Sequence, residues 1–315
     1  MNYRSIADAS KTVASNLWKL PQDIDLVVGI PRSGMLVAPM VALHLNIKFC
    51  DIEAFINNHR LSHGYTRNTQ KTEIEYPQQA KKILVIDDSV SSGTSMTKIK
   101  ERLSSFEEDF ELIYAAVYAC KGGKEFVDVF LELVPHPRYF EWNLLHREET
   151  STFCYDIDGV LCLDPTEEEN DDGDAYRNFI LNAEQVARSS KPLGYLVTSR
   201  LEKYRAETED WLQSRNIEYK ELFMVDLPDA QTRQKLGRYA SFKAEVYGSL
   251  PESRLFIESE NWQAFDIANA TGKHALDYKN QLLITPNSSL NRVTEIVRHD
   301  FKRKVKRRLK KMMGR

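Results

Sequence analysis

The sequence alternates between short apolar runs typical of buried strands and longer segments with helical periodicity. This alternation favours parallel sheets with helices on their faces. In the first half we expect strands at 26–30, 48–52, 83–86 and 112–118, with helices at 34–45 and 95–103. In the second half we expect strands at 152–155, 194–197, 221–225 and 255–257, with helices at 176–189, 203–215, 233–248 and 262–271. A polar stretch at 136–152 predicts a linker. The fold class is therefore α/β, with domains at 1–145 and 151–290 and a basic C-terminal helix at 291–315.

Composition limits the class of protein and the cellular compartment that we expect. Hydrophobic residues make up 42% of the 315 residues and charged residues 28%, which excludes wholesale disorder. No apolar run reaches the roughly 20 residues that span a bilayer, and the start lacks a secretory signal. The four cysteines show no CxxC spacing, so we expect reduced core thiols and a cytoplasmic protein.

Charge is distributed unevenly along the chain. Residues 298–315 contain ten Lys or Arg and one Asp, a local charge of +9, so the rest carries −12. An acidic body gives no basic face for nucleic acid, and we expect no specific nucleic-acid partner. The basic tail carries apolar residues at helical intervals and fits an anionic membrane surface. A solvated terminal helix or a helix that binds another subunit remains open.

The most specific motif of the first half is IDDSVSSGTSM, which follows the expected strand at 83–86. A strand ends in two carboxylates, and a short Ser/Gly/Thr loop then opens a helix. Backbone N–H groups at such a helix start bind phosphate, and the loop hydroxyls add donors. The alternative is an ordinary acidic turn. A second loop, GIPRSG at 29–34, has glycines and the donor Arg32, and it predicts a second anion site.

Together these loops resemble the type I phosphoribosyltransferase family over about residues 1–145. The resemblance implies binding of phosphoribosyl pyrophosphate (PRPP), with Asp87 and Asp88 on the ribose hydroxyls. The implied PRPP-binding residues are Arg32, Ser33, Gly34, Asp87, Asp88, Ser89, Ser91, Ser92, Gly93 and Thr94. The polar segment at 57–71 matches the family's mobile loop, in which Arg67 and Lys71, with Arg60, would neutralise the leaving pyrophosphate.

In the second half, four expected strand or helix ends bear chemically active groups. Asp156 and Asp158 follow a strand as DxDG, and extended alternation would aim both to one side. Thr198 ends a second strand, Lys243 lies on a helix, and Glu258 ends a further strand. Two carboxylates with Mg²⁺ can attack a phosphoryl group and move a proton.

This order resembles the haloacid dehalogenase (HAD) phosphatase superfamily over about 151–290. The resemblance implies a Rossmann-like fold in which Asp156 is the nucleophile, Asp158 the general acid/base and Thr198 the phosphoryl ligand. Lys243 would steady the charge, with Lys235 as the weaker rival. Asp156, Asp158 and Glu258 would hold Mg²⁺, although Glu258-Ser-Glu260 stands where paired aspartates are usual. The acidic segment 167–174 is expected to be a solvated flap rather than a calcium loop, and too short for a large cap.

The domain combination resembles the phosphoribosyltransferase–phosphatase pairs of ribofuranose-containing capsule and O-antigen synthesis. It implies transfer of 5-phosphoribose from PRPP to a lipid-linked glycan acceptor, then removal of the 5-phosphate. The basic tail would contact the inner face of the membrane. Two alternatives stay open: a nucleobase phosphoribosyltransferase fused to an unrelated phosphatase, and a PRPP-sensing regulator.

Overall fold

The computed structural model describes residues 1–62 and 74–286. It divides into two compact units, Met1–Trp142 and Asn143–Arg315, each of which is described by itself. Three sequence predictions lie outside the described residues: the roles of Arg67 and Lys71, and the basic helix at 291–315.

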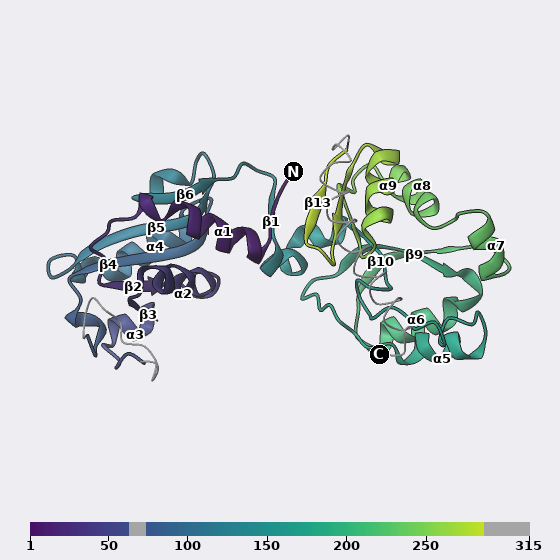
Figure 1. The fold of residues 1–315 in the computed structure, drawn as a ribbon, viewed down its shortest axis with the longest axis horizontal. Coiled ribbons are helices and arrows are strands. Elements are labelled where there is room, and N and C mark those ends of the chain that lie inside the picture. The colour runs from purple at the N-terminus through teal and green to yellow at the C-terminus, as the bar shows by residue number, and fades with distance from the viewer. Residues whose placement is uncertain (63–73, 287–315) are drawn as a thin grey trace, which may run out of the picture. The chain divides into compact units, whose positions relative to one another are not determined.

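The first unit is built on a five-stranded parallel sheet with the order β3-β2-β4-β5-β6 (Figure 1). The strands of this unit are β1 (Asn2–Arg4), β2 (Leu26–Gly29), β3 (Lys48–Asp51), β4 (Lys82–Val90), β5 (Glu111–Ala119), β6 (Val129–Leu133) and β7 (Arg138–Phe140). Its helices are α1 (Ile6–Asn16), α2 (Gly34–Leu45), α3 (Ile52–Ile56) and α4 (Thr94–Leu103). A separate parallel pair joins β1 to β7.

Two apolar clusters hold this sheet, one on each face. The helices α1 and α2 pack on one face against Val27, Leu84 and Ile86. The helices α3 and α4 pack on the other face against Val28 and Val85. Successive side chains of a strand point to opposite faces, and strands buried on both sides read as continuous apolar runs. That is why the run at 83–86 identifies the centre of the sheet.

The second unit contains a six-stranded mixed sheet with the order β10-β9-β8-β11-β12-β13. Its strands are β8 (Cys154–Tyr155), β9 (Leu193–Leu201), β10 (Tyr219–Val225), β11 (Leu255–Glu258), β12 (His274–Asp277) and β13 (Leu282–Ile284). Its helices are α5 (Asp174–Asn182), α6 (Arg205–Ser214), α7 (Ala230–Lys235), α8 (Ala240–Ser249) and α9 (Asn261–Thr271). Helices α8 and α9 cover one face, and α5 and α6 lie on the other (Figure 1).

The α/β class with parallel sheets is confirmed, and several details of the prediction are wrong. The last strand, β13, runs antiparallel to β12, so the second sheet is not purely parallel. Strand β4 continues through Asp87 and Asp88 to Val90 instead of ending before them. The two units divide between Trp142 and Asn143, inside the segment 136–152 where the boundary was predicted, but this segment also contains β7 and two short 3₁₀ helices, Glu141–His146 and Glu148–Thr152.

Two predicted helices differ in extent. The helix predicted at 233–248 is broken into α7 and α8, because Gly237 adopts a left-handed conformation (φ +59°) that ends a helix. The helix predicted at 176–189 ends at Asn182, after which the Ala183 carbonyl accepts a hydrogen bond from Trp211 Nε1 at 2.9 Å. Within the described part of the chain, no helix has the length and apolar character needed to cross a bilayer.

Candidate active sites

The first candidate site lies where β4 passes through Ser91–Gly93 into α4. Gly93 has φ +75°, and a Cβ placed on it would lie 2.2 Å from the ring of Phe126, so only glycine fits this turn. Among the described side chains, none caps the first turn of α4, whose N–H groups therefore remain available as donors. An uncapped helix start after a small-residue loop can bind a phosphate.

The second loop of this unit lies directly beside the acid pair. Gly34 begins α2, and a Cβ on it would lie 2.6 Å from the Ile86 carbonyl oxygen and 3.2 Å from Asp87 Oδ1. Ser33 is the N-cap residue, Arg32 is exposed, and the Pro31–Arg32 peptide bond is cis. The structure therefore brings the two predicted anion loops together around Asp87.

Asp87 and Asp88 form a hydrogen-bonded acid pair. The Asp88 backbone N–H donates to Asp87 Oδ1 at 2.8 Å, and Trp142 Nε1 donates to Asp88 Oδ2 at 2.8 Å. Burial and the neighbouring Asp88 charge raise the pKa of Asp87 to about 8. Burial also raises the pKa of Asp88. Two adjacent carboxylates repel each other, and this repulsion favours a bound proton. It also favours a ligand that brings hydrogen-bond donors or positive charge to the pair.

The hydroxyl groups of the phosphate loop already have partners in this structure. Ser91 Oγ lies 2.9 Å from His136 Nε2, and Ser92 Oγ lies 3.0 Å from Thr94 Oγ1. Sequence reasoning missed His136 and Trp142 because both fall in the predicted linker. Arg60, expected in the mobile loop, is exposed and pairs with Glu75 at 3.3 Å.

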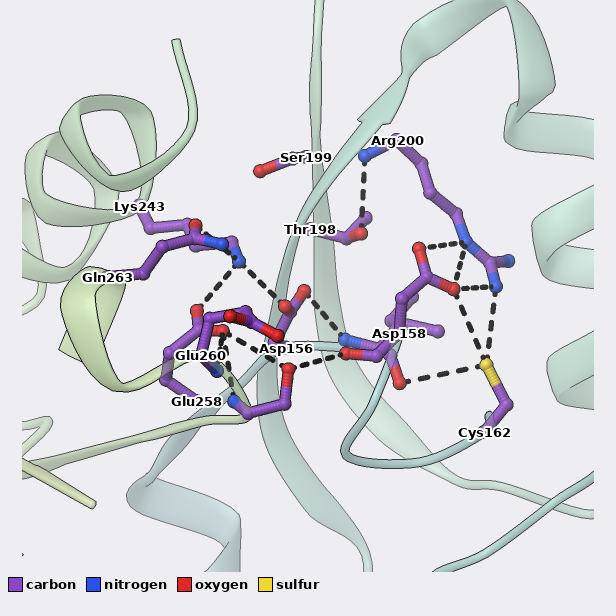
Figure 2. Close-up of polar contacts among 12 residues, drawn as sticks. Asp156, Asp158, Cys162, Thr198, Ser199, Arg200, Lys243, Glu258, Glu260 and Gln263 are labelled. Carbon is purple, nitrogen blue, oxygen red and sulfur yellow. Dashed lines mark hydrogen bonds and ion pairs between the residues drawn. The ribbon is translucent and has the colours of Figure 1, made fainter. Parts of the chain in front are cut away.

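The second candidate site lies at the carboxyl ends of β8, β9 and β11, where Figure 2 shows the side chains of three strand ends. The Lys243 ammonium bridges Asp156 Oδ2 at 2.6 Å and Glu258 Oε2 at 2.7 Å. It also donates to Gln263 Oε1 at 3.1 Å. All three members of this ion-pair cluster are buried. Lys243 therefore lies in this cluster, whereas Lys235 is exposed on α7, and the role predicted for Lys243 stays a prediction.

Glu258, rather than Glu260, faces Asp156. Its Oε1 accepts from the backbone N–H groups of Ser259 (2.9 Å) and Glu260 (3.1 Å), while its Oε2 binds Lys243. Burial raises the pKa of Asp156 well above its usual value, and the Lys243 charge opposes this while Glu258 reinforces it. Burial alone would lower the pKa of Lys243, but the Asp156 and Glu258 charges outweigh it and raise the pKa.

The strand alternation that was expected to aim Asp156 and Asp158 to one side does not extend to these residues. Strand β8 ends at Tyr155, and a turn follows in which the N–H groups of Val160 and Leu161 donate to the Ile157 carbonyl. Strand alternation stops there. Asp158 instead binds the buried Arg200, with Nη2 to Oδ1 at 2.6 Å and Nε to Oδ2 at 3.2 Å (Figure 2).

Several polar groups lie next to the Asp158–Arg200 ion pair. Cys162 Sγ lies 3.4 Å from Asp158 Oδ1 and 3.4 Å from Arg200 Nη2. Thr198, buried on β9, accepts from the Arg200 backbone N–H at 3.2 Å. Arg200 was not among the predicted site residues, although its place two residues after Thr198 at a strand end was a usable signal. Asp164 was also missed: burial and the charges of Asp158 and Glu260 raise its pKa.

The ion-pair cluster presents carboxylate oxygens next to each other. Asp156 and Glu258 share the single ammonium group of Lys243. Mg²⁺ takes such hard oxygen ligands. Across residues 1–62 and 74–286, however, no group of three or more His, Cys, Asp or Glu side chains is arranged to hold a metal. Asp158, expected as a third ligand, is bound to Arg200 instead.

The acidic segment at 167–174 is mostly exposed, as expected of a solvated flap, but hydrogen bonds of Asp171 and Asp172 tie it to the fold. Asp171 accepts from the N–H groups of Gly173 and Tyr176 at the start of α5. Asp172 accepts from the Ala230 N–H at 2.8 Å and from the Tyr204 hydroxyl at 3.0 Å. These hydrogen bonds use the carboxylates that a calcium ion would need.

Comparison with known proteins bears on the first unit. Residues 2–135 match the phosphoribosyl transferase domain family. The chain is 33% identical over 94 residues to the transcriptional regulator GfcR of Methanococcoides burtonii, a match that covers 29% of this chain and 43% of that protein. It is 26% identical over 126 residues to the xanthine-guanine phosphoribosyltransferase of Idiomarina loihiensis, covering 39% and 74% of the two chains.

Among solved structures, the Helicobacter pylori xanthine-guanine-hypoxanthine phosphoribosyltransferase is 19% identical, with a TM-score of 0.33, over 45% of this chain and 92% of that chain. Residues 2–135 are therefore similar in sequence to phosphoribosyl transferase domains, and the curated regulator that the chain matches is covered over less than half of its length. The match ends at residue 135, so the phosphatase class of the second unit stays a prediction.

The first prediction concerns the pH dependence of stability. Below pH 3.8 Asp87 is protonated in both the folded and unfolded states, and above that value only the folded state keeps the proton. The Asp87 contribution therefore lowers stability as the pH rises from about 4 to about 8. We expect Asp87→Asn to raise the Tm at pH 9 by about 3–5 °C, a ~1 kcal/mol effect, and to change it little at pH 4.

Calorimetric unfolding across this pH range measures the effect, with Asp109→Asn, an exposed aspartate of the same unit, as the control. A Tm difference between Asp87→Asn and wild type that does not grow with pH would contradict the assignment.

The second prediction concerns the ion-pair cluster. Lys243→Met keeps most of the side-chain volume but leaves Asp156 and Glu258 buried without their cation. Removing one partner of a buried pair costs about 3–5 kcal/mol, and we expect a loss of that size in urea unfolding. Lys235→Met, on exposed α7, should change stability by less than about 0.5 kcal/mol. Equal effects of the two variants would show that the cluster is not formed.

Proposed function

We propose that this chain is a bifunctional enzyme that transfers 5-phosphoribose from PRPP to a glycan acceptor and then removes the 5-phosphate. Support for the first step comes from the phosphoribosyl transferase family match and from the two anion loops that meet at Asp87. Support for the second comes from the cluster in which Lys243 of α8 bridges Asp156 and Glu258 at the ends of two strands. This second arrangement is the observation that carries the proposal.

In the transfer step the protein positions and stabilises rather than forms covalent bonds. The start of α4 and the hydroxyls of Ser92 and Thr94 would hold the 5-phosphate, and Asp87 and Asp88 would accept hydrogen bonds from the ribose hydroxyls. Arg32 would bind the pyrophosphate, which PRPP carries as its magnesium complex. The bond from the anomeric carbon to pyrophosphate breaks, and the acceptor oxygen forms the new glycosidic bond.

In the hydrolysis step Asp156 is the proposed nucleophile. One of its carboxylate oxygens bonds to phosphorus while the bond from phosphorus to the ribose 5-oxygen breaks. Asp158 gives that oxygen a proton and later takes one from the water that releases phosphate. This role requires Asp158 to leave Arg200 in part. Asp156 and Glu258 would hold Mg²⁺, whose chemistry there is to neutralise phosphoryl oxygens.

Coupling the two steps explains why they share one chain. The transfer leaves a phosphomonoester on its product, and hydrolysis makes a reversible transfer proceed forward. An enzyme that made nucleotides for use as nucleotides would lose its product to such a phosphatase. A glycan fits better, in the way of ribofuranose-containing capsule or O-antigen synthesis. The ten basic residues after 297 would keep the enzyme at the inner face of an anionic membrane, beside a lipid-linked acceptor.

A nucleobase acceptor is the second candidate, because one relative is a xanthine-guanine phosphoribosyltransferase. Incubation with PRPP, Mg²⁺ and xanthine, guanine or hypoxanthine separates the candidates. Release of pyrophosphate with a purine, and none with lipid-linked oligosaccharides, would replace the glycan by a base.

The third prediction separates the two steps by variants. With PRPP, Mg²⁺ and lipid-linked oligosaccharides extracted from a ribofuranose-producing bacterium, Asp156→Asn should release pyrophosphate normally and accumulate a phosphorylated glycan, visible by mass spectrometry. Its phosphate release should fall on the order of 10³-fold, as for loss of a nucleophile. Asp87→Ala with Asp88→Ala should abolish pyrophosphate release. If Asp156→Asn gives the same unphosphorylated product as wild type, the sequential scheme is wrong.

A further inference from the structure

The segment His136–Trp142 contacts the first candidate site at three points. Trp142 Nε1 donates to Asp88 Oδ2 at 2.8 Å, and Arg138 Nη2 donates to the Val90 carbonyl at 2.8 Å. His136 Nε2 lies 2.9 Å from Ser91 Oγ. The three groups that it contacts belong to the end of β4 and to the phosphate loop. One short segment therefore contacts both the acid pair and the phosphate loop. We call residues 136–142 the brace.

The brace is itself anchored on two sides. Strand β7 pairs in parallel with β1, with Arg138 opposite Asn2 and Phe140 opposite Arg4. The Phe140 ring stacks with two aromatic rings, with ring centroids 5.3 Å from Tyr118 and 4.9 Å from Trp142. The Arg138 guanidinium also lies over the Phe140 ring at 5.5 Å. These contacts hold the Trp142 indole in the position from which its N–H donates to Asp88.

The brace lies beyond the residues that match the phosphoribosyl transferase domain family, which end at 135. Its polar composition predicted a linker, so its contacts with the site come from the structure alone. It is nevertheless the last part of the first compact unit, which ends at Trp142.

We propose that the brace positions the PRPP site, with Trp142 as the residue that orients the Asp88 carboxylate toward the ribose. The inference rests on the proposed binding of PRPP by the first unit. Asp88 is only 6% exposed, so the groups packed around its carboxylate determine how it is oriented. A hydrogen bond to a carboxylate is stronger than one between neutral groups. Trp142 donates to Oδ2, and this contact fixes how the Asp88 carboxylate is turned.

The fourth prediction tests this orientation with Trp142→Phe. Phenylalanine keeps an aromatic ring to stack on Phe140 but loses the five-membered ring that carries the indole N–H, so the fold of the brace should persist. We expect the Kd of the full-length protein for PRPP with Mg²⁺, measured by titration calorimetry, to rise about tenfold. Trp262→Phe, which changes a half-exposed tryptophan of the second unit, is the matched control and should leave the Kd unchanged.

A spectroscopic readout distinguishes positioning from a merely structural role. The protein has four tryptophans, which 5-fluorotryptophan labelling makes visible by fluorine NMR. PRPP with Mg²⁺ should shift the Trp142 resonance in the wild-type protein, because its hydrogen-bond partner changes environment. The resonance is assigned by its absence in Trp142→Phe or, if that variant does not fold, by elimination with Phe at positions 18, 211 and 262.

The outcomes separate this inference from the proposed function. If the wild-type protein does not bind PRPP, the proposed function fails and the inference fails with it. If the wild type binds PRPP while Trp142→Phe keeps a Kd within twofold and the Trp142 resonance does not move, only the brace is wrong. A tenfold weaker Kd, or a shifted Trp142 resonance where the variant does not fold, supports it.

Discussion

The parallel order of neighbouring strands decides where the chemically active side chains of this protein meet. Parallel strands present their carboxyl ends at one edge of a sheet, so residues far apart in the chain come together there. In the first unit β2 and β4 are neighbours, and the loops after them meet at Gly34 and Asp87. In the second unit β8 lies between β9 and β11, and Asp156, Thr198 and Glu258 share one edge.

Both sites contain acidic groups whose charged forms are disfavoured by burial. The two sites compensate for this desolvation in different ways. Asp87 and Asp88 share their site with few positive charges, and Asp87 keeps a proton up to a pKa of about 8. Asp156 and Glu258 share the Lys243 ammonium, and Asp158 is bound to Arg200. Buried ion pairs add little net stability, because desolvation offsets their attraction. Their value at such a position is the fixed placement of reactive groups.

The sequence predicted the central strands well because they are buried on both faces and read as unbroken apolar runs. The sequence also singled out Gly93 and Lys243. A glycine is distinctive in a short loop before a helix, and a lysine is distinctive in a helix that is otherwise largely apolar on its buried side. Strand alternation misled for Asp158, since β8 ends one residue before Asp156 and a turn redirects the chain. The brace was missed because β7 has three residues and its partner β1 lies more than a hundred residues away. Its contacts with Asp88 and Ser91 depend on that long-range strand pairing. A pattern within a short stretch of sequence cannot predict such a pairing.

The central claim is that one chain installs a phosphorylated pentose and then removes its phosphate. A phosphorus-31 NMR time course of the wild-type protein with PRPP, Mg²⁺ and the acceptor tests it directly. The account predicts pyrophosphate first, a transient phosphomonoester on the acceptor, and finally one inorganic phosphate for each pyrophosphate. A phosphomonoester that persists without release of inorganic phosphate, or inorganic phosphate without prior pyrophosphate, would contradict it.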